Sequence, residues 1–539
     1  MKNTLYYGDN LDILRRYIPD ESVDLIYLDP PFNSKATYNV LFAEKNGSAS
    51  AAQIKAFEDT WHWDKKAEET YLELVEKGPK KVADLIQALR SFLGSNDMMA
   101  YLTMMAARLV ELCRVLKPTG SIYLHCDPTA SHYLKLVMDA VFRHINFRNE
   151  IIWKRTSAHN DPKKYGNNYD CILYYSQGDM PVWNDLRLPY SEEYLKSHYA
   201  QQDDYGYYTT RDLSAPDHGT DSQGLRYEWE GVKPPTGRTW TCVKEKMAKY
   251  ESQDLLVYSP RGMPRLKRYL DKMPGISIQA LWTDIPPINS QAKERLGYPT
   301  QKPEALLERI IQASSNEDDI IMDPFCGCGT AIAVAEKLNR KWIGIDITHL
   351  AISLMKHRLQ DTFGDSLDYE VIGEPVDVKS AIALKDQDPY QFQWWALGLV
   401  GARPAESEKK KGADKGIDGY IYFHDEPKLT TKKIILQVKG GHVGSHHIVE
   451  LKGVLEREKA QIGVFITLEE PTKPMITEAV SSGYYRSPIG HDYPKMQILT
   501  IEKLLNGAKI EYPSRSVGAD ATFKKAERHK VKKEQERLF

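Results

Sequence analysis

The chain has 539 residues, a length that by itself predicts roughly three or four domains. Its composition is 42% hydrophobic and 27% charged, which excludes a chain that is disordered throughout. The net charge of -2 indicates no polyanion partner for the molecule as a whole, so any basic surface must be local.

Two further classes of protein are excluded. No uncharged apolar run approaches the roughly 18 residues of a membrane helix, so we expect no membrane-spanning segment. The 6 cysteines include no C-x-x-C pair, which argues against a disulfide framework and a structural zinc site. The first residues, MKNTLYYGDN, have no apolar signal-peptide core, and we therefore expect a cytoplasmic protein.

Strand and helix patterns alternate over most of the chain. In chain order they predict a strand at 22–28, a polar and partly helical insertion at 33–95, a helix at 98–116, strands at 121–124 and 319–322, a helix at 331–338 and a strand at 341–345. We expect Pro118-Thr119-Gly120 to end the first of these helices. The alternation is typical of an α/β fold with a parallel sheet.

A glycine-containing loop follows the strand at 319–322. Gly327 and Gly329 let the backbone turn sharply and approach a ligand, and Asp346, at the end of the next strand, can accept hydrogen bonds from ribose hydroxyls. A dinucleotide fingerprint would have a third glycine where Ile332 stands, and a phosphate-binding P-loop would continue Gly-Lys-Ser/Thr. The loop favours a nucleoside ligand without a pyrophosphate over NAD or ATP, with a purely structural turn as the alternative.

The strand at 22–28 ends at Asp29-Pro30-Pro31-Phe32. The two prolines remove backbone donors and stiffen the segment, which leaves the Asp29 carboxylate and the Pro30 carbonyl as acceptors. Two fixed acceptors facing one amino group can turn the exocyclic nitrogen of a nucleobase into a nucleophile. Such a base must leave the duplex, and Phe32 offers a face on which it can stack.

Together these motifs resemble the amino-directed DNA methyltransferases of the β arrangement, in which the catalytic motif precedes the S-adenosylmethionine motif. The matching segments are DPPF at 29–32, GSIYLHCD at 120–127, EIIWKR at 150–155, YPTQKPEALLERI at 298–310, DPFCGCGT at 323–330 and GIDI at 344–347. The resemblance implies a Rossmann-like methyltransferase domain over residues 1–380, with an inserted target-recognition region at about 155–297.

The resemblance also assigns roles to individual residues. It implies catalytic roles for the DPPF motif, and binding of S-adenosyl-L-methionine by Asp323, Phe325, Gly327, Gly329, Thr330, Asp346 and Lys302. The partner would be double-stranded DNA with the target base flipped out, and a homodimer is a possible assembly. Adenine N6 is favoured over cytosine N4 because DPPF-type motifs are more usual with adenine in this family.

A local basic stretch falls inside the predicted recognition region. Between Arg226 and Gly275 there are 11 Lys/Arg and 6 Asp/Glu, or 11 − 6 = +5, interleaved with Tyr227, Trp229, Trp240 and Tyr250. Such a mixture suits contacts with phosphates and unstacked bases, and a solvated face is the alternative. Two hypotheses also hold for Trp61 and Trp63, which either contact DNA or are buried under the insertion. For His125 a structural role is favoured.

A second folded unit is predicted at 388–510, followed by a basic polar tail at 511–539. Strand patterns at 416–423, 434–439 and 462–467 surround Asp418, Gln437 and Lys439. These patterns resemble the Mrr-like branch of restriction endonucleases with the PD-(D/E)xK fold, which is a smaller α/β domain. The resemblance implies a nuclease site of these three residues, with Mg held by Asp418, although the neutral Gln437 removes one negative ligand.

We therefore predict a site-specific DNA methyltransferase fused to a magnesium-dependent endonuclease domain in restriction–modification. The alternative is a solitary methyltransferase whose C-terminal domain only binds DNA. A nicotinamide-dependent oxidoreductase is a third hypothesis, and the missing glycine and phosphate site argue against it.

Overall fold

The structure is a computed structural model. It describes residues 1–31, 62–157, 163, 165–217, 219, 224–289, 291–298, 300–364, 367–405, 416–425, 430–488, 490–513, 522–523 and 525–529, together with the backbone of 37–43 and 49–58. The chain divides into two compact units, of which the first comprises Met1–Asn184 and Ala280–Phe539 and the second Asp185–Gln279. Within the described residues, no helix is long and apolar enough to cross a membrane.

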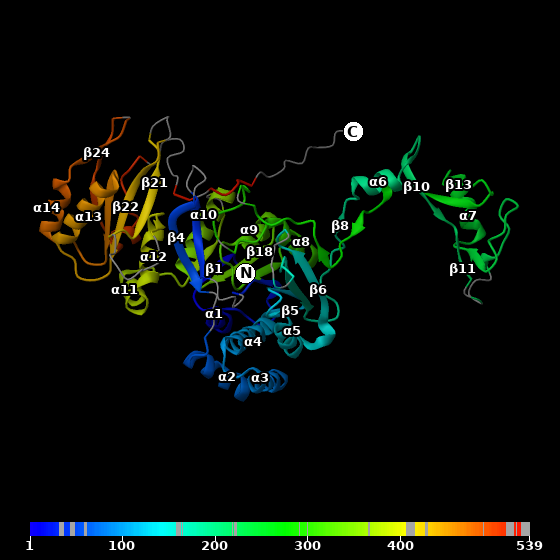
Figure 1. Ribbon diagram of the computed structural model, residues 1–539, viewed down its shortest axis with the longest axis horizontal. Helices are drawn as coiled ribbons and strands as arrows, with labels where there is room; N and C mark the ends of the chain where they lie inside the picture. The colour runs from blue at the N-terminus through cyan, green and yellow to red at the C-terminus, as the bar shows by residue number, and fades with distance from the viewer. Residues whose placement is uncertain are drawn as a thin grey trace. The chain divides into compact units, whose positions relative to one another are not determined.

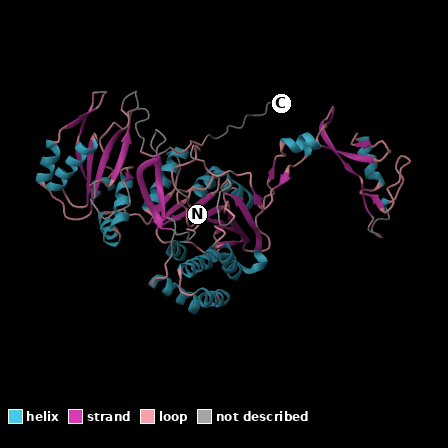
Figure 2. Cartoon of the chain, in the orientation of Figure 1, coloured by secondary structure: helices cyan, strands magenta, loops and turns pink. Residues whose placement is uncertain are grey.

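The first unit contains a nine-stranded sheet with the order β16-β6-β7-β5-β2-β17-β18-β1-β19 (Figures 1 and 2). Its strands are β1 (Thr4–Tyr7), β2 (Val23–Leu28), β5 (Leu116–Cys126), β6 (Phe147–Lys154), β7 (Tyr169–Ser176), β16 (Leu281–Trp282), β17 (Ile320–Asp323), β18 (Lys341–Asp346) and β19 (Glu370–Ile372). The pairs from β5 through β2, β17, β18 and β1 to β19 are all parallel, as the sequence predicts. Strand β7 runs antiparallel to both of its neighbours.

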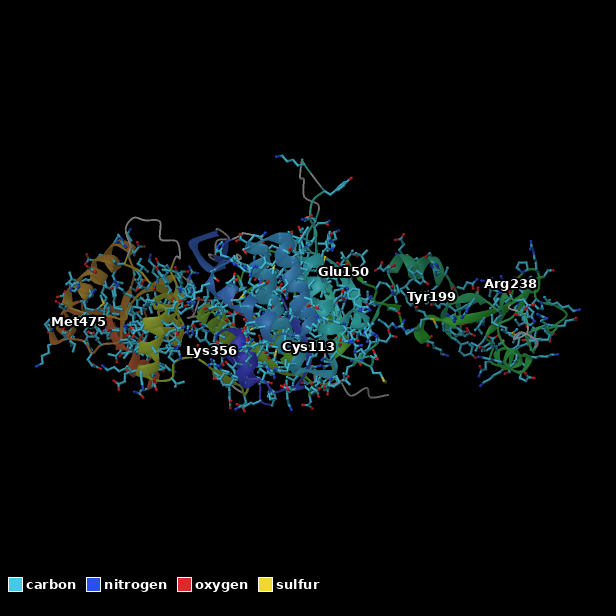
Figure 3. The ribbon with its side chains drawn as sticks, turned by 90° about the horizontal axis from the view of Figure 1, so that it is seen from below. Cys113, Glu150, Tyr199, Arg238, Lys356 and Met475 are labelled. Atoms are coloured by element: carbon cyan, nitrogen blue, oxygen red, sulfur yellow. The ribbon has the colours of Figure 1, made fainter. Side chains whose placement is uncertain are left out.

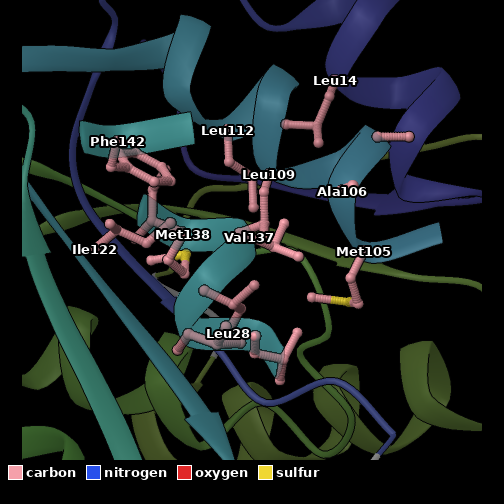
Figure 4. Close-up of a cluster of buried hydrophobic side chains, with 14 of the residues drawn as sticks. Leu14, Leu28, Met105, Ala106, Leu109, Leu112, Ile122, Val137, Met138 and Phe142 are labelled. Carbon is pink, nitrogen blue, oxygen red and sulfur yellow. The ribbon is translucent and has the colours of Figure 1, made fainter. Parts of the chain in front are cut away.

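Helices accompany this sheet and bury its apolar side chains. They are α1 (Asn10–Tyr17), α2 (Lys65–Lys77), α3 (Lys80–Leu93), α4 (Asp97–Val115), α5 (Ser131–Met138), α8 (Glu304–Ser314), α9 (Thr330–Lys337) and α10 (His349–Phe363), with a π-helical turn at Asp139–Arg143 and a 3-10 turn at His144–Asn146. The predicted insertion also contains an antiparallel pair, β3 (Thr37–Ala43) and β4 (Ala49–Glu58). Figure 4 shows Met105, Leu109 and Leu112 of α4 in one buried cluster with Leu28 of β2. The methionine is core filler, as its spacing predicts.

The segment Pro118-Thr119-Gly120 is not the separate turn that we expect from its sequence. Helix α4 ends at Val115, and strand β5 begins at the next residue and continues through the segment. The pairing of β5 with β2 shifts register there, between Val23 and Leu25. A Cβ atom at Gly120 would lie 2.9 Å from the Asp24 carbonyl oxygen, so only glycine lets the irregular strand run this close to its neighbour.

The second unit folds around aromatic side chains of the basic stretch. It contains the sheet β13-β14-β10-β9, formed by β9 (Gln201–Asp203), β10 (Gly206–Asp212), β13 (Leu256–Tyr258) and β14 (Pro264–Tyr269), and the ribbons β11–β12 (Ser214–Pro216, Arg238–Trp240) and β8–β15 (Arg187–Leu188, Ile276–Ser277). Its helices are α6 (Glu192–His198), α7 (Lys244–Ser252) and a 3-10 turn at Leu270–Lys272. Trp229 and Trp240 are buried in its core with Met247. These two tryptophans are therefore core residues rather than stacking platforms for bases. Figure 3 marks this unit by Tyr199 and Arg238.

A separate five-stranded sheet lies in the C-terminal part of the first unit, with the order β20-β21-β22-β23-β26. Its strands are β20 (Arg403–Pro404), β21 (Gly419–Phe423), β22 (Lys432–Lys439), β23 (Ile462–Thr467) and β26 (Met496–Thr500), beside a small ribbon of β24 (Tyr484–Arg486) and β25 (Asp492–Pro494). The helices are α11 (Val378–Gln387), α12 (Pro389–Leu399), α13 (Ser445–Glu458), α14 (Lys473–Ser481) and α15 (Ile501–Leu505). Apolar clusters occupy both faces of the sheet, and one contains Met475, labelled in Figure 3.

Two predicted boundaries are wrong. The junction expected near 381–388 is helix α11, whose Ala381 and Leu384 belong to the core of the five-stranded sheet. Part of the predicted polar tail also packs against the fold. Thr522 is buried and its Oγ1 accepts a hydrogen bond from the backbone N–H of Tyr422, and the ring of Phe523 stacks 4.4 Å from that of His357. Apolar packing holds helix α11, whereas a hydrogen bond and a ring contact hold the described part of the tail.

Candidate active site

One pocket at the carboxyl ends of the central strands of the nine-stranded sheet brings together the two predicted motifs. Its wall includes Asp29, Pro30, Pro31, Tyr298, Lys302, Asp323, Phe325, Gly327, Thr330 and Asp346. Asp29 follows β2, whereas the glycine loop follows the adjacent parallel strand β17. Parallel neighbours end at the same edge, so residues almost 300 positions apart face one space. Phe32 lies outside the described residues.

The glycine loop is held by its neighbours in a narrow conformation. The Gly327 N–H donates to Asp346 Oδ2 at 2.9 Å, and a Cβ atom at this position would lie 3.0 Å from the Tyr298 ring. Gly329 begins α9 with φ +73°, and a Cβ there would lie 2.7 Å from the Met355 side chain. Left-handed backbone and close packing together explain both glycines.

Two carboxyl groups lie on the loop side of the pocket, of which Asp323 is buried and Asp346 is half-buried. The Asp346 Oδ1 atom accepts hydrogen bonds from the backbone N–H and hydroxyl of Thr348 at 2.9 and 3.0 Å. Burial raises the pKa of Asp346 to about 6, although these hydrogen bonds oppose the shift. Burial also raises the pKa of Asp323 well above its usual value, and Asp323 Oδ1 accepts the Phe325 N–H at 3.0 Å. Desolvation therefore dominates this side of the pocket.

The opposite side of the pocket contains an ion pair that the sequence did not predict. Lys302 Nζ donates to Asp29 Oδ2, and both side chains are largely buried. Asp29 Oδ1 is buried and has no hydrogen-bond partner in the described part of the chain. One carboxylate oxygen is thus held in place while the other can accept a proton donor in the pocket. The resemblance predicts that Lys302 binds the cofactor, and its observed partner is the carboxylate of the catalytic motif.

Thr330 is buried, and its side chain is hydrogen-bonded to another residue of the protein. Its Oγ1 accepts a hydrogen bond from Arg358 at 3.1 Å, and Arg358 also donates to Glu304 at 2.8 Å. Phe325 packs against the large core at its edge and lines the pocket. Cys326 and Cys328 are both buried, and the described residues contain no group of three or more His, Cys, Asp or Glu side chains that could hold a metal ion.

A third group of residues completes the pocket and was missed from the sequence. Gly8, Asp9 and Asn10 follow strand β1, and the buried Arg108 of α4 joins them. Arg108 donates to Asp9 Oδ1 at 2.8 Å and to Asn10 Oδ1 at 2.5 Å. Two signals in the sequence point to this group. Gly-Asp-Asn stands between a strand and a helix, and one arginine interrupts the apolar stripe of α4.

The other singled-out side chains have defined surroundings. His125 is fully buried, with Nδ1 2.9 Å from the Tyr27 hydroxyl and Nε2 3.2 Å from Asp170 Oδ2. Trp63 packs at the edge of the large core, and its Nε1 donates to Glu68 at 3.0 Å, whereas Trp61 lies outside the described residues.

In the basic stretch, the Arg265 side chain interacts with other residues of the second unit. It donates to Thr210 Oγ1 at 2.9 Å and forms an ion pair with Asp212.

The three predicted nuclease residues gather beside strand β22. Gln437 and Lys439 are two residues apart on β22, and Asp418 immediately precedes the neighbouring strand β21. Asp418 Oδ2 accepts the backbone N–H of Val438, between them, at 2.7 Å. Gln437 is buried, and its Oε1 has no hydrogen-bond partner among the described residues. The structure thus brings all three together.

Comparison with known proteins identifies two regions of the chain. The model of a DNA methylase family matches residues 23–357. A second family model, described as NACHT-associated inactive Restriction Endonuclease 1, matches residues 392–506.

Curated relatives include the Type II methyltransferase M.EcaI of Enterobacter cloacae, 29% identical over 361 residues, which cover 66% of this chain and 69% of that protein. The Type III restriction-modification enzyme StyLTI Mod subunit of Salmonella typhimurium is 26% identical over 358 residues, 63% of this chain but only 50% of that protein. The DNA adenine methyltransferase YhdJ of Escherichia coli is 26% identical over 357 residues, 66% of this chain and 82% of that protein. Because the first family model spans more than half of the chain and contains both the Asp29 segment and the glycine loop, the protein belongs to the DNA methylase family.

Proposed function

We propose that the protein transfers a methyl group from S-adenosyl-L-methionine to an exocyclic amino group of a base in double-stranded DNA, with adenine N6 favoured over cytosine N4. The observation that carries the proposal is the single pocket lined by both the Asp29-Pro30-Pro31 segment and the glycine loop with Asp346. The name of the Escherichia coli relative supports adenine, and the names of the other two support a role in restriction–modification.

The residues of the pocket fit S-adenosylmethionine. Gly327 and Gly329 leave the loop side without Cβ atoms, and Asp346, at the end of β18, offers a carboxylate to ribose hydroxyls. When bound, S-adenosylmethionine supplies an electrophilic methyl group. Ionised Asp346 accepts hydrogen bonds from ribose hydroxyls more strongly than its protonated form, so the raised pKa of this group links cofactor affinity to pH.

The Asp29 side of the pocket suits the target amino group. Asp29 Oδ1 and the Pro30 carbonyl provide two acceptors for the two N–H bonds of a flipped base. Hydrogen bonds to both protons favour a pyramidal nitrogen, whose lone pair can attack the methyl carbon. Lys302 holds the other Asp29 oxygen, so the acceptor is oriented before the base enters.

Nucleoside analysis tests this function directly. DNA is incubated with the protein and labelled S-adenosylmethionine, digested to nucleosides and separated. We expect the label in N6-methyladenine, whereas label in N4-methylcytosine would change only the base. Label in a ring-carbon product, or retention of labelled NAD instead of a labelled S-adenosylmethionine analogue, would overturn the proposal.

A specific observation favours a second function for the C-terminal domain, which is DNA binding without cleavage. Asp418 is the sole carboxylate of the predicted site, and Gln437 offers a neutral oxygen. Magnesium prefers several oxygen ligands with carboxylates among them, so the described donor set fits this ion poorly. The matching family model is also described as inactive. The predicted magnesium-dependent nuclease remains the alternative.

A cleavage assay separates the two. Full-length protein is incubated with unmethylated and self-methylated DNA in the presence of magnesium or manganese. We expect the wild-type protein not to cut either DNA. The Lys439→Ala protein should bind DNA more weakly than the wild type, and its rate of methyl transfer at saturating DNA should be unchanged. Cutting of unmethylated DNA that disappears in Asp418→Ala and Lys439→Ala would restore the nuclease prediction.

A further inference from the structure

A row of buried polar side chains runs from the pocket across three neighbouring strands. It consists of Tyr27 on β2, His125 on β5 and Asp170 on β7, with exposed fractions of 2%, 0% and 1%. Tyr27 Oη lies 2.9 Å from His125 Nδ1, and His125 Nε2 lies 3.2 Å from Asp170 Oδ2. Only Tyr27 lines the pocket. The methyl transfer described above uses none of the three.

The sheet itself generates this row. Tyr27 and Asp29 are two residues apart at the end of β2, and therefore their side chains share one face. Strand β5 pairs with β2 on one side and with β7 on the other, which places the three polar groups side by side. Trp153 of β6 packs edge-on against His125, with ring centres 5.8 Å apart. Burying three polar groups costs free energy that apolar side chains would not, so folding alone does not explain the row.

The surroundings assign the hydrogen-bond direction. Burial alone would raise the pKa of Asp170, but the hydrogen bond from His125 and the charges of His125, Lys302 and Arg155 lower it below its usual value. The ionised Asp170 therefore accepts the Nε2–H of His125, and Nδ1 is left as the acceptor of the pair. Burial raises the pKa of Tyr27 well above its usual value, so its hydroxyl stays protonated and donates to Nδ1.

This arrangement meets a requirement of the proposed transfer. When the amino nitrogen bonds to the methyl carbon, the methyl–sulfur bond breaks and leaves its electron pair on sulfur. The nitrogen then carries a positive charge and must lose one proton. Asp29 is already hydrogen-bonded by Lys302, whereas Tyr27 lines the same pocket and its hydroxyl is in contact with His125 Nδ1.

We propose that Tyr27, His125 and Asp170 form a proton relay that takes up the proton released from the methylated amino group. One N–H bond of the base breaks as its proton moves to Tyr27 Oη, while the original Tyr27 proton moves to His125 Nδ1. The resulting imidazolium lies against the Asp170 carboxylate. His125 and Asp170 act through Tyr27 and are positioning residues. The inference rests on the proposed amino-group transfer.

Single-turnover methyl transfer in H2O and D2O tests the relay. We expect Tyr27→Phe and Asp170→Asn to slow transfer by about 10²-fold and to reduce the solvent isotope effect that the wild type shows. Affinity for DNA and for a non-reactive S-adenosylmethionine analogue should remain at the wild-type value. Tyr123→Phe is the matched control, because it removes an equally buried hydroxyl that contacts Ser314 at 2.6 Å, and it should change neither quantity.

Two results would overturn the relay. One is a Tyr27→Phe protein with the wild-type single-turnover rate and isotope effect, and the other is a Tyr123→Phe protein impaired to the same degree. If Tyr27→Phe fails to bind the analogue, Asp170→Asn alone decides by the same criteria. Failure of the proposed function is seen separately, because wild-type protein would then yield no N-methylated nucleoside.

Discussion

At the scale of single residues, the two carboxylates of the pocket are prepared in opposite ways. Asp29 is fixed by a cation, since Lys302 donates to its Oδ2. Asp346 is surrounded by neutral donors and is desolvated, which raises its pKa to about 6. The same chemical group is therefore held by an ion pair at the Asp29 end of the pocket, whereas at the Asp346 end its charge changes with pH near 6.

We expect Asp29→Ala to reduce methyl transfer by at least ~10²-fold, because one of the two acceptors of the amino group is lost. Binding of an S-adenosylmethionine analogue should largely survive, whereas Asp346→Ala should weaken that binding first. Initial rates and equilibrium dialysis measure the two effects. A near wild-type rate for Asp29→Ala would mean that Asp29 is not the acceptor.

Cofactor affinity should fall as the pH drops below about 6, because ionised Asp346 accepts hydrogen bonds from ribose hydroxyls more strongly than the protonated carboxyl group does. One pH unit below this pKa, about a tenth of Asp346 is ionised, so the Kd of the analogue should rise by up to about tenfold. Asp346→Asn should bind more weakly, with a flat profile.

The pH dependence of folding stability runs the other way from that of cofactor affinity. The folded protein holds the Asp346 proton more tightly than the unfolded chain does, so the contribution of Asp346 to the free energy of unfolding decreases as the pH rises from 4 to 6.

At the scale of elements, function depends on how strands end. The loop between β17 and α9 closes around Gly329 in a left-handed conformation, which sets the start of the helix. Strand β14 of the second unit instead presents alternating basic residues, of which Arg265 and Lys267 are already paired with carboxylates. The first element forms part of the pocket, whereas in the second the carboxylates neutralise part of the basic charge.

Gly329→Ala should lower stability by at least about 1–2 kcal/mol, because a Cβ is disfavoured by this amount in the left-handed region and would also lie 2.7 Å from the Met355 side chain. Gly453→Ala is the matched control. Gly453 lies inside helix α13, and a Cβ there would meet nothing within 4 Å, so we expect a gain of about 0.5–1 kcal/mol. Thermal unfolding of the full chain measures both changes. Equal effects of the two substitutions would contradict the conformational explanation.

Replacing Arg261 and Arg268 with glutamine should weaken DNA binding and flatten its salt dependence. Each phosphate contact that is lost reduces the number of counterions that the DNA releases when the protein binds. Arg265→Gln should change the slope less, because its guanidinium is held by Asp212 and Thr210. Titrations at several salt concentrations give the slope of log affinity against log salt. An unchanged slope in the double variant would place these arginines away from DNA.

At the scale of the whole first unit, helix α12 links the pocket to the five-stranded sheet. Trp395 is buried in the core of that sheet. The preceding residue, Trp394, packs instead against a small apolar cluster that contains Tyr298, and Tyr298 lines the pocket. The pocket cluster and the core of the five-stranded sheet therefore share one helix, which contributes a tryptophan to each.

This helix allows a comparison of neighbouring tryptophans. Trp394→Ala should weaken binding of the S-adenosylmethionine analogue several-fold, because Tyr298 loses packing behind the glycine loop. Trp395→Ala should lower stability by about 3–5 kcal/mol through the cavity it leaves, with analogue binding unchanged while the protein is folded. Isothermal titration and unfolding curves check both. Weaker analogue binding in Trp395→Ala alone would reverse the assignment of the two side chains.

The sequence by itself determined the local features of this protein. Strand and helix periodicities predict most elements of the nine-stranded sheet, and the glycine loop with Asp346 predicts a nucleoside pocket. These features follow from short-range chemistry, since glycines permit left-handed backbone, prolines remove donors and apolar spacing selects helix or strand. The roles of the site residues stay predictions until the variants above are measured.

The tertiary structure decided contacts between distant residues that neither local spacing nor the resemblances predict. It pairs Lys302 with Asp29, packs Trp229 and Trp240 into a core and aligns Tyr27, His125 and Asp170 across three strands. Sheet order and register set these contacts, and neither is encoded in local spacing. A buried tryptophan and a DNA-facing one have the same sequence pattern, because burial depends on what the rest of the chain places against them.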